Sequence, residues 1–404
     1  MSDQSHATSL PKAEVFDQQH AGNLPFVLPI AGGVALLISL IWGFFDREQF
    51  AFSWLFAFIY FFTICVGALF WTLVHHATDA EWSVVVRRVL ENVAALIPWV
   101  FLFFIPLLFC SSILLGWWDM TGWWSDTHTN ETLSGKWPYL THAFFYVRLV
   151  IYFLGLSFVA RAMLCNSTKQ DEDGHPRYTI TMRKLSFAGI PIMAICLTFA
   201  SVDWLMGLDY KWFSTMWGVY IFAGSAGSGM CLLVLLTTFL RSKGYLSFVT
   251  MEHYHIMGKL MLAFCVFWAY IGFDQYMLIW YANIPEETSY FIRRNVGSWW
   301  YWSTFLVVFR FFIPFPLLLL QATKKNPKYL CMVAGWILFM QMVDMYLVVM
   351  PMFHRTGFAP SLLDLLSLIA IGAPLAFIFI KNLGKHSLFP VRDPRLERSL
   401  KLTN

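Results

Sequence analysis

The sequence predicts an all-α integral membrane protein with about ten transmembrane helices. Its 404 residues are 58% hydrophobic and only 13% charged, and the mean hydropathy is +0.59. These values lie outside the usual range of a soluble domain. Ten apolar runs also have the roughly 20 residues that a helix needs to cross the hydrocarbon core of a bilayer.

The ten runs divide the chain into a polytopic membrane domain, residues 25–385, between an N-terminal tail, 1–24, and a basic C-terminal tail, 386–404. In chain order they are Pro25–Phe45, Phe50–His75, Val93–Gly116, Leu140–Cys165, Leu185–Leu208, Ser214–Leu240, His253–Asn283, Gly297–Gln321, Lys328–Met350 and Ser361–Lys381.

The distribution of Lys and Arg predicts that both termini are cytoplasmic. With this orientation 19 basic residues fall on the inner side and 6 on the outer side, in keeping with the positive charge of cytoplasmic loops. The segment Asp79–Asn92 mixes apolar and basic residues, and we expect it to lie along the inner interface before the third helix. A net charge of only +4 gives no reason to expect a nucleic-acid partner.

The cysteines and histidines predict no metal or cofactor bound by this chain. Seven cysteines occur singly, without a CxxC, a CxxCH or a cluster spacing, so we expect them to be small buried residues. A b-type haem needs two facing histidines at matched depth. His75 or His76 could pair with His255 on the inner side alone, which argues against a dihaem cytochrome.

Charged residues inside the spans are the most informative ones, because each needs a partner, a water-filled cavity or a function. The fourth helix carries His142 near its outer mouth and Arg148 about 9 Å deeper, at 1.5 Å per residue. The fifth helix runs back to the outer side and carries Asp203 near its outer end. These three residues predict either a buried salt bridge or an outer site that handles protons.

A second Arg–Asp pair is expected between Arg310 of the eighth helix and Asp344 of the ninth, and here we prefer a structural ion pair. The recurrence of the pattern four helices later suggests two related four-helix bundles, helices 2–5 and 6–9, flanked by helices 1 and 10. Asp274 of the seventh helix is a further outer-half carboxylate, without an evident basic partner, and is a candidate for the same outer proton pathway or quinol site as His142, Arg148 and Asp203.

A second group of ionisable residues lies toward the inner side and is a candidate route for protons. Most of its members could equally be side chains that reach the headgroups, although Lys259 is about a turn and a half into its helix. The group consists of His75, His76, Glu252, His255 and Lys259, with Glu91 nearby.

Four stretches resemble the polytopic quinone-interacting membrane subunits related to those of polysulfide reductase and nitrite reductase (the NrfD/PsrC-like family). Within it the chain most resembles the second such subunit of alternative complex III, the ActF type. The stretches are HHATDAEWSVVVRRVLE (75–91), SVDWLMGLDYKWFSTMWGVYIFAG (201–224), FWAYIGFDQYMLIWYANIPEET (267–288) and VDMYLVVMP (343–351).

The resemblance implies two four-helix bundles and membership of a quinol-oxidising complex in a bacterial inner membrane. The partners it implies are a paralogous polytopic subunit and outer-side subunits carrying iron–sulfur clusters and c-type haems. Quinol, such as menaquinol, would be the ligand, with His142 and Asp203 of the right type and depth to accept its hydrogen bonds. A family role for Asp274 is not implied, because the family has a small polar residue there.

The leading hypothesis is therefore an accessory membrane subunit that supplies a docking surface, proton-conducting residues and a second or vestigial quinol site. A secondary transporter or channel is the alternative from another class, and it would need a midplane site with broken helices. A purely structural scaffold is a third, which predicts that every buried charge is paired.

Overall fold

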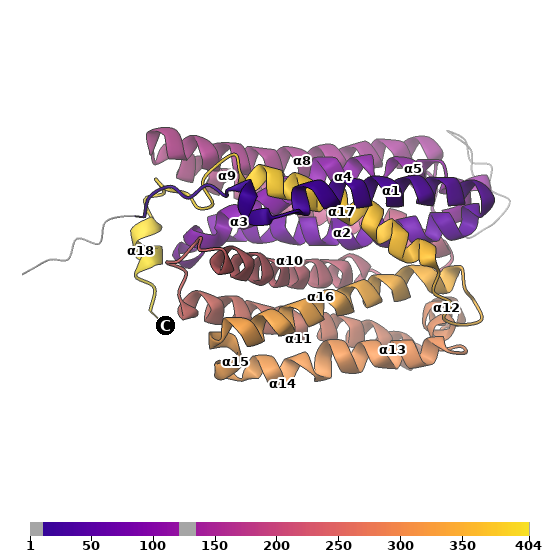
Figure 1. The fold of residues 1–404 in the computed structure, drawn as a ribbon. Helices are drawn as coiled ribbons and strands as arrows, with labels where there is room; N and C mark the ends of the chain where they lie inside the picture. The colour runs from indigo at the N-terminus through magenta and orange to yellow at the C-terminus, as the bar shows by residue number, and fades with distance from the viewer. Residues whose placement is uncertain (1–10, 121–134, 404) are drawn as a thin grey trace, which may run out of the picture.

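The computed structural model describes residues 11–120 and 135–403, and all regular elements within these ranges are helices (Figure 1). In the described residues, ten helices or runs of short helices are long and apolar enough to cross a membrane. This confirms the predicted fold class.

The first half of the chain supplies five of these spans. Short turns accompany them: η1 (Gln18–Ala21), η2 (Glu81–Ser83), η3 (Trp118–Met120) and η4 (Met206–Asp209). The helices are α1 (Leu24–Phe45), α2 (Arg47–Ala77), the consecutive α3 (Val84–Ala94), α4 (Ile97–Leu102), α5 (Ile105–Leu108) and α6 (Ser111–Leu114), α8 (His142–Asp173) and α9 (Arg177–Trp204).

The second half supplies the other five. One of them is interrupted by a π-helical segment, η5 (Val308–Phe312), and another ends in a turn, η6 (Met350–Met352). The helices are α10 (Trp217–Ser242), α11 (Met251–Ala282), α12 (Pro285–Arg294), α13 (Trp299–Val307), α14 (Pro314–Leu319), α15 (Gln321–Lys325), α16 (Pro327–Val349), α17 (Leu362–Leu383) and α18 (Leu396–Leu400).

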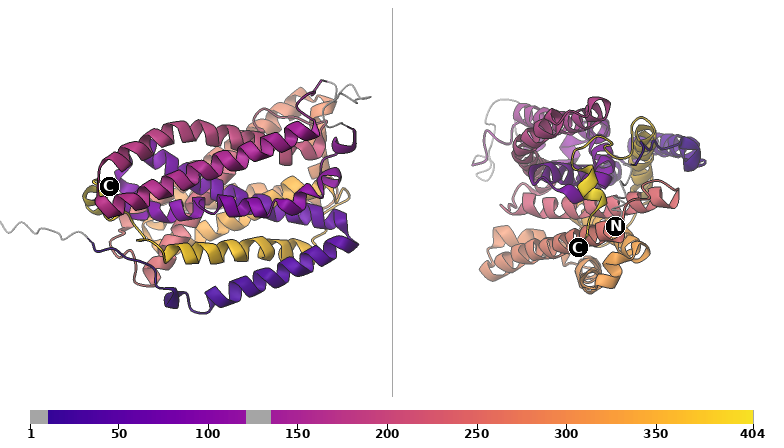
Figure 2. Two further views of the ribbon diagram at one scale, coloured as in Figure 1. Left: turned by 90° about the horizontal axis from the view of Figure 1, so that it is seen from above. Right: turned by 90° about the vertical axis from the view of Figure 1, so that its left-hand side faces the viewer.

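The spans form two groups of four. In one group α2 packs against α9 and the α3–α6 run, and α8 packs against α9; in the other α10 packs against α11 and α16, with α13–α14 beside them. The flanking helices α1 and α17 lie against each other and against α2, and the end-on view of Figure 2 separates the two groups.

Glycines bring the two groups into close contact where α2 crosses α10. A Cβ atom added at Gly67 would lie 1.9 Å from the carbonyl oxygen of Ser225, and one at Gly229 would lie 2.5 Å from the carbonyl carbon of Gly67. No side chain fits there, so backbone meets backbone, as small residues allow in membrane helices.

The expectation that Asp79–Asn92 lies along the membrane interface is wrong. Every residue of α3 is buried, and the helix is the first part of the third span, which runs from Glu81 to Leu108. The span continues as short helices broken near Pro98 and Pro106, because proline lacks the N–H that an unbroken helix requires.

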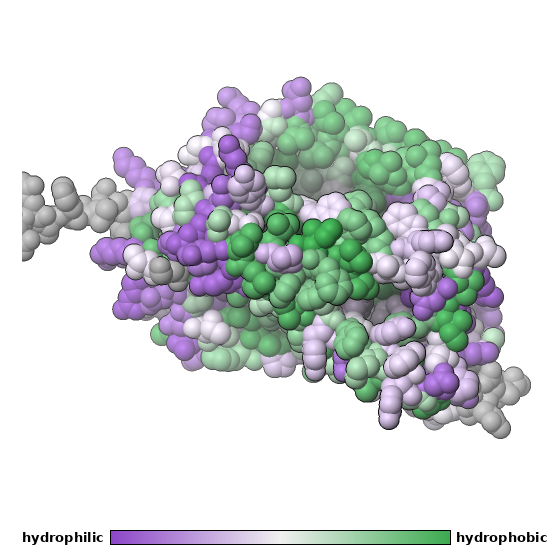
Figure 3. Space-filling model, turned by 90° about the horizontal axis from the view of Figure 1, so that it is seen from below, coloured by the Kyte–Doolittle hydropathy of each residue, from purple (hydrophilic) through white to green (hydrophobic). Residues whose placement is uncertain are grey.

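Residues near the two ends of the chain meet at one end of the molecule, which we call the terminal end. Phe16 donates its backbone N–H to the Leu383 carbonyl, and Leu388 donates to that of Glu14. The far end, where α8 begins and α9 ends, is called the opposite end. Between two hydrophilic ends, the face in Figure 3 is mostly hydrophobic, as a membrane-spanning surface requires.

Candidate functional site

Arg148 and Asp203 form a bidentate ion pair near the opposite end. Arg148 donates from Nε to Oδ2 and from Nη2 to Oδ1 of Asp203, each at 2.8 Å. Both residues are buried, and Tyr152, one turn after Arg148 on α8, donates its hydroxyl to Oδ2 at 2.7 Å. The remaining guanidinium nitrogen bonds to the Tyr139 carbonyl at 2.7 Å. The predicted contact between the fourth and fifth spans is therefore present.

A cavity of about 190 Å³ lies beside this ion pair, with Asp203 in its wall. The other lining residues come from the end of α9, the connection after α9, and the chain after α6 and before α8. Most are aromatic or aliphatic, with Lys136 as a second charge. They are Trp117, Lys136, Tyr139, Leu140, Val202, Met206, Gly207, Tyr210, Trp212 and Phe213.

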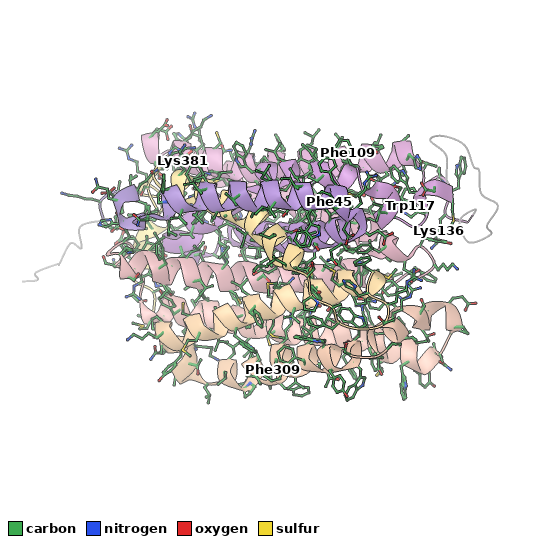
Figure 4. The ribbon with its side chains drawn as sticks, turned by 45° about the vertical axis from the view of Figure 1, so that its right-hand side comes forward. Phe45, Phe109, Trp117, Lys136, Phe309 and Lys381 are labelled. Carbon is green, nitrogen blue, oxygen red and sulfur yellow. The ribbon has the colours of Figure 1, made fainter. Side chains whose placement is uncertain are left out.

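The walls of the cavity carry donors that are not used within the described structure. The indole nitrogens of Trp117 and Trp212 are buried without a hydrogen-bond partner. A buried donor of this kind is costly unless a ligand or water satisfies it. Trp117 and Lys136, labelled in Figure 4, lie together at the opposite end.

The Lys136 ammonium donates to the backbone carbonyl of Tyr210. Burial lowers the pKa of Lys136, and the charge of Asp209 opposes part of that effect. Burial, reinforced by the charge of Asp203, raises the pKa of Tyr139 well above its ordinary value, so this phenol remains protonated. The cavity thus offers one carboxylate, one ammonium and several neutral donors.

His142 does not join Asp203 in the part of the chain that the structure describes, contrary to the predicted pair. Its Nε2 lies 2.7 Å from the Trp118 carbonyl, and its ring stacks on the Trp118 indole with centroids 4.0 Å apart. It stands at the start of α8, while Asp203 accepts its hydrogen bonds from Arg148 and Tyr152. Sequence alone could not show which face of the helix end His142 would take.

Arg310 and Asp344 form the expected second ion pair, with Nη1 and Oδ2 at 2.5 Å. Asp344 also accepts hydrogen bonds from Tyr220 and Trp268, and Arg310 donates to Gln341. The cavity beside Arg310 measures about 10 Å³, which is room for about one water molecule. Every charge of this pair is satisfied, as a structural role requires.

At the terminal end, His75 and His76 are buried at the end of α2. Neither nitrogen of either imidazole has a hydrogen-bond partner in the described structure. Nε2 of His76 lies 3.8 Å from a Glu91 oxygen, and the His75 ring packs edge-on against Trp82 with centroids 4.9 Å apart. Two unpartnered imidazoles beside a carboxylate are suited to water-mediated proton transfer.

The charged network around these histidines was not predictable from the sequence. Arg87 bonds Glu91 at 3.0 Å and Asp393 at 2.8 Å, while Arg88 lies 3.1 Å from Glu91 and 2.9 Å from Asp171. Both arginines are fully buried. Both belong to the segment expected along the inner interface, and the one available signal for the network was their i, i+4 and i, i+3 spacing to Glu91.

The other members of the predicted inner group lie at the start of α11 and have partners of their own. Glu252 accepts from Lys325 at 2.6 Å, and Nδ1 of His255 is 3.7 Å from its second oxygen. Lys259 is exposed on the side of α11. None of the described contacts joins these residues to His75 or His76, so the inner group divides into two.

Asp274 is half-buried on α11 and has neither a hydrogen bond nor an ion pair with any described residue.

Asp364, another carboxylate within a span, caps α17. Ser361 and Asp364 form a capping box, and Ser53 and Tyr346 donate to the Asp364 carboxylate at 2.5 and 3.2 Å. Within residues 11–120 and 135–403, no group of three His, Cys, Asp or Glu side chains is arranged to hold a metal ion.

Comparison with known proteins adds no family to this description. No protein-family model matches the chain, and no curated protein is significantly similar to it.

Proposed function

We propose that the chain is a membrane subunit of a quinol-oxidising respiratory complex of the alternative complex III type. In this proposal the cavity beside Asp203 receives a quinol head group, and the electrons pass to an iron–sulfur or haem centre on a partner subunit. The membrane is a bacterial inner membrane, and the terminal end faces the cytoplasm, as the positive-inside distribution favours.

The cavity beside Asp203 is the observation that supports the proposal. Its volume of about 190 Å³ suits one substituted ring, and its aromatic walls suit a flat apolar head group. The unpartnered indole nitrogens of Trp117 and Trp212 could donate to quinone oxygens. Its position at an end of the bundle suits a ligand that arrives from the lipid.

Asp203 has the acceptor capacity for the chemistry. A carboxylate has about four lone-pair sites, and Arg148 and Tyr152 use three of them. One site remains for one quinol hydroxyl, which passes its proton to Asp203, while the second hydroxyl releases its proton to water at the opposite end as the two electrons leave. Because Arg148 fixes both carboxylate oxygens, Asp203 is held in one orientation toward the cavity.

His75, His76 and Glu91 form the proposed proton site at the terminal end. Their unpartnered, buried nitrogens need water, and water would connect them to the cytoplasmic face. The transporter alternative gains less support, because the cavity beside Arg310, in the interrupted span, has room for about one water molecule.

Comparing Asp203→Asn with Asp344→Asn tests the proposal. Each substitution breaks a buried Arg–Asp pair and leaves a guanidinium without its carboxylate, but only Asp203 lines the cavity. We expect Asp203→Asn to slow quinol oxidation per assembled complex by about 100-fold, the lower range for a lost proton acceptor. Asp344→Asn should leave that rate unchanged.

Rates are measured with a soluble quinol in purified complexes, after quantifying the assembled fraction of each variant. Equal rates for the assembled Asp203→Asn complex and the natural one would contradict the proposed role of the cavity. A purified complex without any cluster- or haem-bearing subunit would contradict the wider assignment.

A further inference from the structure

Asp274 lies on an exposed face of α11, although it is inside a predicted membrane span. Three of the four helix positions three and four residues away are exposed: Tyr270 by 61%, Met277 by 43% and Leu278 by 53%. The fourth, Ile271, is buried, as is Gln275. The half-buried carboxylate therefore lies at the edge of the lateral surface of the molecule.

The depth of Asp274 makes this placement costly. α11 has 32 residues and is about 48 Å long, so a hydrocarbon core of about 30 Å covers roughly its middle 20 residues. Both Lys259 and Asp274 fall within that stretch. An ionisable side chain there needs a partner or a water-filled cavity.

Lys259 and Asp274 differ in how they can reach a headgroup. Side chains of a helix tilt toward its N-terminus. Lys259 is near the N-terminal end of α11, so its long side chain extends toward the nearer interface and can snorkel. Asp274 is nearer the C-terminal end, so its short side chain tilts toward the membrane centre and cannot reach the nearer headgroups.

The described residues of this chain do not satisfy Asp274. Arg310 is buried and bound to Asp344 and Gln341. Arg294 is also buried, and it donates to the backbone carbonyls of Leu347 and Val348. Arg293, toward the opposite end, is bound to Asp209. No basic side chain among the described residues therefore pairs with Asp274.

We propose that the face of α11 around Asp274 is the docking surface for a transmembrane helix of a different protein, which places an Arg or Lys side chain opposite Asp274. This inference does not rest on quinol oxidation. A parallel two-fold dimer of this chain would bring two Asp274 carboxylates to the same depth, where they repel each other. A different partner with a basic residue satisfies the carboxylate.

The aromatic residues of the same surface suit such a partner. Tyr270 and Tyr281 are exposed by 61% and 84%. Large aromatic side chains are enriched at interface hot spots, and their faces can also hold a cation. An arginine near Asp274 would thus find both a carboxylate and aromatic rings within one or two turns of α11.

Photo-crosslinking in the membranes of the natural host tests the inference. A benzoylphenylalanine at Met277, one turn from Asp274, should crosslink to a membrane-spanning segment of another protein, identified by mass spectrometry. That segment should contain an Arg or Lys within one turn of the crosslinked residue. The same probe at Ile151, on the exposed side of α8 and 54% exposed, is the matched control and should not capture this segment.

Charge reversal then distinguishes an ion pair from mere proximity. Asp274→Lys should lower the Met277 crosslink about tenfold, and exchanging the partner's basic residue for Asp should restore it. Crosslinks only to lipid, only to a second copy of this chain, or to a segment without a basic residue would overturn the proposal. So would an unchanged yield in Asp274→Lys, and neither result depends on quinol turnover.

Discussion

A buried arginine persists in a membrane protein where several acceptors surround it, and Arg148 and Arg310 both meet that condition. Arg148 donates hydrogen bonds to both oxygens of Asp203 and to the Tyr139 carbonyl. Arg310 donates to Asp344 and Gln341. The difference between the two pairs lies in their surroundings. The cavity of about 190 Å³ lies beside Asp203, whereas the one beside Arg310 has room for about one water molecule.

Because the Arg310–Asp344 pair is enclosed, we expect its removal to affect stability and not chemistry. Asp344→Leu alone leaves a buried guanidinium unpaired and should lower the free energy of unfolding by about 3–5 kcal/mol. The double variant Arg310→Met, Asp344→Leu should recover most of this loss, because two apolar side chains need no partner. Thermal unfolding of the solubilised chain measures both, and a double variant no more stable than Asp344→Leu would contradict the expectation.

The charged residues within spans were sufficient to predict the two Arg–Asp pairs, because lipid leaves a buried charge few alternatives. Their tyrosine partners were not predictable. Tyr152 comes from the helix of its arginine, but Tyr220 comes from a third helix, so the second contact depends on packing between spans. The two pairs are consequently less alike than their spacing along the chain suggests.

Among the elements, α2 is the central one, since it contacts α9, α10, α17 and the α3 run. Its N-terminus is fixed by the Asp46 side chain, which accepts from the Gln49 N–H at 3.0 Å.

The existence of all ten spans followed from hydropathy. The burial of α3 did not, because buried and interfacial helices with two arginines have the same composition, and only the partners Asp393 and Asp171 distinguish them.

The crossing of α2 and α10 should tolerate no side chain at Gly67. Gly67→Ala places a Cβ 1.9 Å from the Ser225 carbonyl oxygen and forces the two helix groups apart. We expect it to destabilise the chain by about 1–3 kcal/mol or more, as overpacking does. Gly335→Ala on α16 is the control, because its Cβ meets nothing within 4 Å and alanine favours a helix. Equal thermal stability of the two variants would show that the crossing is looser than described.

At the scale of the whole molecule, the C-terminal segment closes the terminal end of the bundle. Asp393 and Arg395 are buried there; Asp393 binds Arg87, and Arg395 binds Asp79 at 2.7 Å. Ser399 of α18 donates to the carbonyl of Trp82, whose ring covers His75. The proposed proton site therefore lies beneath this segment, whose sequence indicated only a basic tail.

The docking of this segment should depend on Asp393 and be insensitive to pH between 5 and 8. Burial alone would raise the pKa of Asp393, but Arg87 and Arg395 outweigh it and hold the pKa well below its ordinary value of about 3.9. A carboxyl whose pKa is lowered by folding contributes its stability above the unfolded value and loses it as the pH falls through the folded value. That loss lies below pH 4.

Hydrogen exchange measures the docking directly through the amides of the C-terminal segment, several of which are hydrogen-bonded. After correction for intrinsic rates, their protection should be constant from pH 5 to 8. Asp393→Asn should lower it about 100-fold, which corresponds to about 3 kcal/mol for a broken buried pair. Glu397→Gln removes only the exposed pair with Lys401 and should leave protection unchanged. The contrary result would be equal protection of these amides in the Asp393→Asn and Glu397→Gln variants. The segment would then be held by its apolar contacts, and His75 and His76 would remain covered without the ion pair.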